Sequence, residues 1–157
     1  MPEVKQAQWI DQVRAEHRKL GELVDELRGF VEQSRPDPGE KGSHTWASEL
    51  SSKLVRLHDE LFRHFRFEEQ GGMVEDLTVA HPRAAPEVDL VLQDHKEILS
   101  ELRRLMTSTL AYSEGLEPED PALRRRVTAL LDHLHEHERV ETDLIQRLEY
   151  RDTGAAD

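Results

Sequence analysis

The sequence predicts an all-α fold, an up-down-up-down antiparallel four-helix bundle. In four long segments, apolar residues recur at alternating steps of three and four, which is typical of the buried face of a packed helix. Short connections join the first segment to the second and the third to the fourth, so these neighbours should run antiparallel. No useful length of alternating apolar and polar residues indicates a strand.

The first two helices are bounded by residues that stop or cap a helix. We expect the first over residues 6–34, because two prolines and a glycine follow in the segment 34–39. The second should begin near Ser43 or Thr45, either of which can cap an N-terminus, and end at the glycine pair 71–72.

The third helix should start at Pro86, a residue favoured in the first turn, and run to about Ser113. The segment 71–85 before it is the longest connection. Long connections in small domains are often functional, so this one is either a gate near the site described below or a plain connector.

The fourth helix should start at the pair Asp120-Pro121, a cap followed by a proline, and end near Tyr150. Residues 151–157 are expected to be a disordered C-terminal tail. The chain is therefore predicted to form one domain over residues 6–150.

In each of the four segments, we call the row of apolar residues spaced by three and four the seam of that helix. Polar residues interrupt all four seams. The interrupting residues are His17, His64, Glu68, His95, His137 and Glu141. At about 1.5 Å per residue, their levels along an antiparallel bundle differ by roughly 10 Å at most. They therefore converge on one layer of the core. Burying unpaired imidazoles and carboxylates costs several kcal/mol each, and bound metal is the natural compensation.

The polar pattern also repeats. Glu16-His17-Arg18 and Asp94-His95-Lys96 both place a histidine between an acid and a base, and each is followed by an H-x-x-x-E motif on the next helix. Two such helix pairs would arrange the side chains with approximate two-fold symmetry. That symmetry suits two metal ions bridged by two carboxylates.

The other histidines lie near loops or off the strict seams. They are His44, His58, His81, His133 and His135. His58 and His133 are close enough to the seams that either is left open as an additional ligand. His133 and Glu60 lie one turn before the two H-x-x-x-E histidines, so each is a candidate for orienting a ligand ring.

Composition narrows the possible partners. The net charge of -12 argues against nucleic acid as a partner, and no apolar segment approaches the ~18 residues of a membrane span. Because the chain has no cysteine, a metal would be bound through nitrogen and oxygen. Its N-terminal segment has no apolar signal core, which predicts a cytoplasmic protein.

The order of the seam motifs resembles the hemerythrin-like, or HHE cation-binding, family over roughly residues 10–148. This resemblance implies a four-helix bundle that holds a non-haem di-iron centre of two carboxylate-bridged iron ions. In this interpretation His17 and His64 bind one iron and His95 and His137 the other. Glu68 and Glu141 then bridge the two ions.

Two positions depart from the oxygen-carrying members of that family. Leu99 stands where those members have a second histidine one turn after the third-helix histidine, and Glu141 follows His137 by four places, where five is common. The resemblance therefore implies binding of, or reaction with, a small oxidant (O2, peroxide or NO) in sensing or redox handling. Peroxide decomposition is one activity that this allows, although no dedicated catalytic motif is present.

Two other functions stay open. The domain could be an iron-responsive interaction module without turnover, for which the sequence names no protein partner. It could also be a structural bundle whose polar layer is hydrogen-bonded without metal. The sequence argues against a ferritin-like di-iron site, because no histidine has a glutamate three residues before it.

Overall fold

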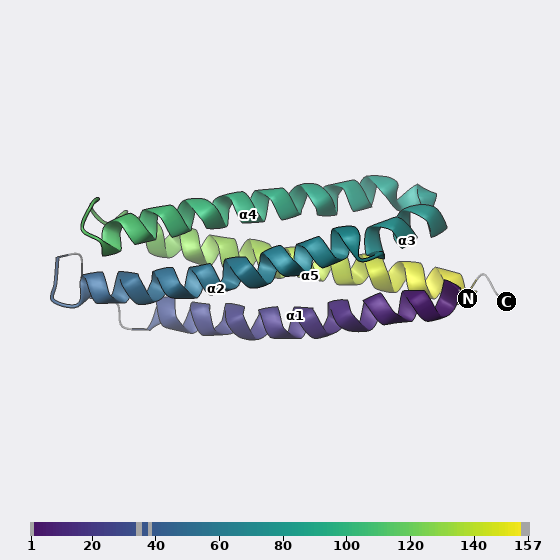
Figure 1. Ribbon diagram of the computed structural model, residues 1–157, viewed down its shortest axis with the longest axis horizontal. Helices are drawn as coiled ribbons and strands as arrows, with labels where there is room; N and C mark the ends of the chain where they lie inside the picture. Colours follow the sequence, from purple (N-terminus) through teal and green to yellow (C-terminus); the bar gives the residue numbers. More distant parts are fainter. Residues whose placement is uncertain (1, 34–35, 38, 155–157) are drawn as a thin grey trace.

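The computed structural model describes residues 2–33, 36–37 and 39–154, with side chains described over 9–33, 36–37 and 39–149. Its four long helices are α1 (Pro2–Glu32), α2 (Ser43–Gln70), α4 (Ala85–Ser113) and α5 (Leu123–Gly154). Both α1 and α4 pack against α2 and α5, so the four helices close a ring. The α1–α2 and α4–α5 connections lie at one end, opposite the start of α1 and the end of α5 (Figure 1). The predicted all-α, up-down-up-down bundle is confirmed.

The helix boundaries differ from the expected ones mainly at the chain ends. α1 starts four residues before residue 6 and ends at Glu32. The expected tail is partly wrong, because α5 continues beyond Tyr150 to Gly154. The remaining residues of that expected tail, 155–157, lie outside the described residues.

The N-terminus of α2 is not capped by a side chain. The helix begins at Ser43 as expected, but Gly42 precedes it with φ at 97° and no side-chain cap bond forms. The expectation that Ser43 or Thr45 caps this helix is wrong. A glycine in the left-handed conformation makes the turn instead, which other residues adopt only with strain.

The connection 71–85 is helical, which corrects the expected loop. It contains α3 (Met73–Ala80) and a 3-10 helix, η1 (Pro82–Ala84). Gly72 turns the chain between α2 and α3 at a φ of 110°, a conformation that favours glycine. Met73 and Leu77 are buried against the bundle. This packing favours a connector over a gate.

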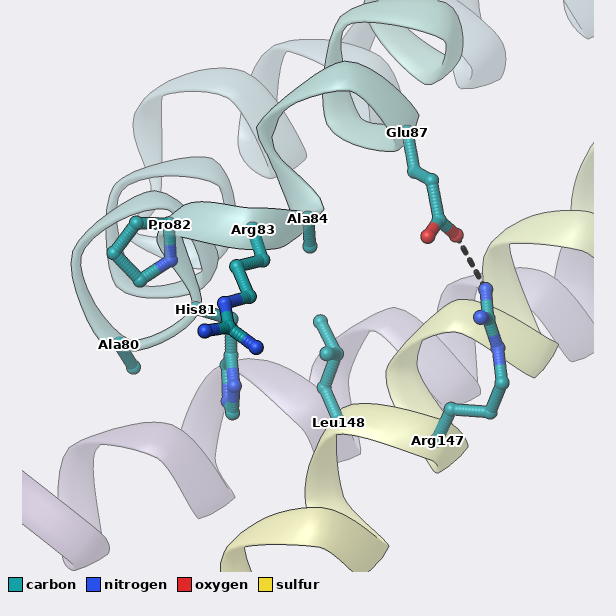
Figure 2. Close-up of a pocket in the computed structure, with 8 residues that line it drawn as sticks. All are labelled: Ala80, His81, Pro82, Arg83, Ala84, Glu87, Arg147 and Leu148. Atoms are coloured by element: carbon teal, nitrogen blue, oxygen red, sulfur yellow. Dashed lines mark hydrogen bonds and ion pairs between the residues drawn. The ribbon is translucent and has the colours of Figure 1, made fainter.

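A pocket of about 350 Å³ lies between η1 and the last turns of α5. Figure 2 shows Leu148 pointing into it, with the ion pair of Glu87 and Arg147 at one side. None of the six polar seam residues lines this pocket. The pocket therefore belongs to the end of the bundle and not to the polar layer.

The core consists of two apolar clusters. The larger cluster occupies the half of the bundle nearest the α1–α2 and α4–α5 connections. It includes Leu54, Leu102 and Leu134. The smaller contains Val13 and Leu144 and includes the buried residues of α3. The polar seam residues lie between these clusters on every long helix. Within the described residues, no helix combines the length and apolarity that a membrane span requires.

Candidate metal centre

The six polar seam residues come together in one layer, and all but His17 are buried. Their ligand atoms form two groups of four, and within each group these atoms lie within 4.8 Å of one another. The first group is His17, His64, Glu68 and Glu141; the second is His95, His137, Glu68 and Glu141. Both groups share both glutamates, so the arrangement has two halves joined by two carboxylates.

The His17/His64 half is built by α1 and α2. Nε2 of His17 lies 3.0 Å from Oε1 of Glu141, and Nε2 of His64 lies 3.0 Å from Oε1 of Glu68. The two imidazole rings meet edge to face, with centroids 4.9 Å apart and an interplanar angle of 68°.

The His95/His137 half is built by α4 and α5. Nε2 of His95 lies 3.5 Å from Glu68 and 3.6 Å from Glu141, and Nε2 of His137 lies 3.3 Å from Glu141. The two rings again have centroids 4.9 Å apart and an interplanar angle of 68°. The identical ring geometry agrees with the two-fold symmetry inferred from the sequence repeat.

Many polar atoms of the layer are buried without a hydrogen-bond partner. They are Nε2 of His64, His95 and His137, Nδ1 of His95, both carboxylate oxygens of Glu68 and Oε2 of Glu141. Buried polar atoms are normally satisfied, and each unsatisfied one costs about 1–3 kcal/mol. These nitrogen and oxygen atoms converge from four helices, so the donor set fits a cation better than it fits a hydrogen-bonded layer.

Burial makes the two shared carboxylates electrostatically unequal. It raises the pKa of Glu68 well above its usual value, and the charge of Glu141 adds to that shift. Burial opposes the ionisation of Glu141 too, but its polar contacts with Glu68, His137 and His17 outweigh burial and lower its pKa. Glu68 therefore holds a proton more readily than Glu141 does. A cation in the layer would favour the ionised form of both carboxyls.

The acids that precede the seam histidines orient rings on the neighbouring helices. Nδ1 of His64 lies 2.8 Å from Glu16, and Nδ1 of His137 lies 2.8 Å from Asp94. With Nδ1–H donating outward, Nε2 of each ring faces the shared glutamates. The sequence repeat contained both acids, but it gave no indication of their partners.

The two residues expected to orient a ring differ in outcome. Nε2 of His133 lies 2.5 Å from Asp94, so it contacts the acid that holds His137. Glu60 instead forms ion pairs with Lys19 and Arg63. The expectation for Glu60 is wrong, and His133 acts through a carboxylate.

Glu138 stands off the apolar face of its helix, so the sequence pattern gave no sign of it. Its Oε1 is buried without a hydrogen-bond partner. Burial raises its pKa to about 7, opposed by His17 and increased by Glu141. The carboxyl of Glu138 therefore lies close enough to the His17/His64 half to interact with its charges.

The histidines left open as extra ligands are outside both buried groups. His58 lies 3.4 Å from Asp59 and stacks on Phe62. His133 belongs to a more exposed third group with Asp94 and Glu97. The shared layer thus contains four histidines.

Comparison with known proteins supports the sequence resemblance. Residues 9–148 match the family model described as the hemerythrin HHE cation-binding domain. No curated protein and no solved structure matches the chain. The match covers nearly the whole bundle and includes all six residues of the layer. The chain belongs to the hemerythrin HHE cation-binding domain family.

Proposed function

We propose that this chain is a non-haem di-iron protein that binds or reacts with a small oxidant, namely O2, peroxide or NO, in sensing or redox handling. The observation that carries this proposal is the pair of overlapping His2Glu2 groups that share both glutamates. In the proposed centre, His17 and His64 hold one ion, His95 and His137 hold the other, and Glu68 and Glu141 bridge them.

The number of protein ligands supports reaction or sensing over oxygen carriage. Each ion would have two imidazoles and two shared carboxylates, which leaves coordination positions open for a small molecule. Position 99, where oxygen-carrying members have a further histidine, supplies no metal ligand here. Its residue, Leu99, is apolar and packs against the larger core cluster. Bound iron would supply the redox chemistry and the open positions.

The surrounding residues pack closely around the layer. Phe65 stacks on His95, with ring centroids 3.9 Å apart, and meets His137 edge-on at 5.5 Å. Apolar clusters lie above and below the layer. Glu16 and Asp94 hold the Nδ1 protons of two rings outside it. Burial of this kind strengthens electrostatic interactions among the charged groups of the site.

A groove between α4 and α5 supports access to the layer from outside. It has a volume of about 390 Å³, and its lining includes His137, Val91 and Leu144. Most of its exposed wall area is apolar, although the acids Glu87, Asp94, Glu97 and Glu136 also line it. The apolar area suits the passage of an uncharged diatomic molecule or hydrogen peroxide.

The test is an absorption titration of iron-loaded protein with peroxide, combined with measurement of oxygen release. Peroxide decomposition converts two peroxide molecules to one dioxygen and two waters. We expect an absorption change in the parent protein that is lost in the His137→Ala variant, whereas the exposed His135→Ala control behaves like the parent. An unchanged spectrum with peroxide, O2 and NO would contradict the proposal.

A second candidate is an iron-responsive interaction module without turnover. The groove favours it because Leu90, 70% exposed, and Val140, 46% exposed, lie on its lining beside a residue of the layer. Apolar side chains this exposed suit a protein contact. Iron binding with spectral changes but no oxygen release above the His137→Ala variant would favour sensing over peroxide chemistry.

A further inference from the structure

The two halves of the layer share a ring geometry but differ in how their histidines are held. On the α4–α5 side, the carboxylate of Asp94 makes two contacts. One oxygen lies 2.8 Å from Nδ1 of His137, and the other lies 2.5 Å from Nε2 of His133. Asp94 is therefore fixed from both sides, and its position fixes the ring of His137.

The α1–α2 side has no matching third residue among the described contacts. Glu16 takes the place of Asp94 beside His64. The residue one turn before His64, which corresponds to His133, is Glu60, and it pairs with Lys19 and Arg63. A carboxylate at this place cannot donate a hydrogen bond to Glu16 unless it is protonated.

Burial and packing differ in the same direction. The side chains of His95 and His137 are each 2% exposed and that of His64 is 3% exposed, whereas that of His17 is 13% exposed. Phe65 stacks on His95 with ring centroids 3.9 Å apart, and its centroid lies 5.5 Å from that of His137 and 5.8 Å from that of His64. These contacts restrict the rings before any ligand binds, so less conformational entropy is lost on binding.

The hydrogen bonds that a cation must displace also differ. Nε2 of His95, of His137 and of His64 are all without a hydrogen-bond partner. Nε2 of His17 is hydrogen-bonded to Glu141 at 3.0 Å. Binding in the His17/His64 half satisfies one buried nitrogen and gives up this bond, whereas binding in the other half satisfies two buried nitrogens and gives up no such bond.

We propose that Asp94 and His133 are positioning residues for His137, and that they make the His95/His137 half the tighter of two metal-binding halves. This inference rests on the proposed function, since it requires that the layer bind metal. It adds an order of filling: the first ion occupies the α4–α5 side and the second the α1–α2 side.

The first experiment compares the halves, with Co²⁺ as the probe because its visible absorption reports coordination geometry. Metal-free parent protein, His17→Ala and His95→Ala are titrated by calorimetry and by absorption. We expect the parent to bind in two steps, His17→Ala to keep the tighter step and His95→Ala to keep only the weaker one. Equal affinities in the two variants, or a tighter remaining step in His95→Ala, would overturn the inference.

The second experiment tests the positioning residues. Loss of a residue that orients a metal ligand typically lowers metal affinity by about 10–100-fold, so Asp94→Ala should weaken the tighter step by roughly that factor. His133→Ala should weaken the same step less, and His133→Gln, whose amide can still donate to Asp94, should restore it. Glu60→Gln and His135→Ala are matched controls that should change neither step.

The outcomes separate this inference from the proposed function. If the parent protein binds neither Co²⁺ nor iron, the proposed function is contradicted. If the parent binds two ions and His133→Ala changes neither binding step, only this inference is contradicted. His133 is 38% exposed, so its replacement should leave the fold intact even if Asp94→Ala does not fold.

Discussion

At the scale of single residues, the layer is arranged so that most of its polar atoms face one another with few hydrogen bonds. Glu68 and Glu141 are fully buried. After burial itself, Glu141 has the largest effect on the pKa of Glu68, and Glu68 and the imidazoles have the largest effects on that of Glu141. Such a cluster destabilises a bundle unless a ligand compensates it. The bundle can therefore be more stable without these carboxyls whenever metal is absent.

Replacing both shared glutamates by leucine tests this residue-scale argument. Apolar replacements of buried charged groups can stabilise a protein by about 1 to 4 kcal/mol, so we expect Glu68→Leu/Glu141→Leu to raise the unfolding free energy of the metal-free protein. Urea denaturation in the presence of a chelator measures it. The double variant should bind no metal. A clear loss of stability would mean that the carboxyls are satisfied within the layer.

At the scale of elements, the start of α5 shows how a short motif positions a long helix. Oδ1 of Asp120 accepts the backbone N–H of Ala122 at 2.8 Å, and Oδ2 accepts a hydrogen bond from Arg126 at 2.9 Å. The turn therefore begins at Asp120-Pro121 as expected, although α5 itself starts at Leu123. This turn sets the register that carries His137 and Glu141 into the layer.

The hydrogen bond from Ala122, with the contribution of Arg126, lowers the pKa of Asp120. The ionised carboxyl of Asp120 therefore stabilises the folded protein above the unfolded-state pKa of this group. That stabilisation is lost as pH falls through the folded-state pKa. We expect Asp120→Ala to lower the unfolding free energy by about 1 kcal/mol at neutral pH, the usual cost of losing a cap. Denaturation at several pH values should show the difference vanish in acid. A difference that persists unchanged there would contradict the capping role.

At the scale of the whole molecule, the layer joins all four long helices at one level. α1 and α2 supply one half, α4 and α5 supply the other, and the shared glutamates come from α2 and α5. An ion in either half would link at least three helices. Metal binding and folding should therefore be coupled.

Metal should accordingly raise the melting temperature. At a free metal concentration of 100 times Kd, binding to the folded state alone adds about 2.7 kcal/mol, or roughly 5 to 10 °C for a chain of this size. Calorimetry with Fe²⁺ under anaerobic conditions measures the shift, and a chelator should reverse it. Glu141→Gln should shift much less than the parent. Identical melting curves with metal and with chelator would argue against the coupling.

Much of this fold was predictable because burial follows a period that the sequence shows directly. The seam residues of all four long helices are buried, apart from the partly buried His17, and the six polar residues meet as their positions predicted. The roles of Glu16 and Asp94 were not predictable, because seam positions are recognised by apolar neighbours and these acids lie beside the seam. α3 was missed because two glycines and a proline flank a segment of only eight residues.

The most direct test of the central claim is a crystal structure of iron-loaded protein with anomalous data collected at the iron absorption edge. We expect two anomalous peaks between Glu68 and Glu141, one beside His17 and His64 and the other beside His95 and His137. A layer without any peak, in which the six side chains satisfy one another by hydrogen bonds, would contradict it.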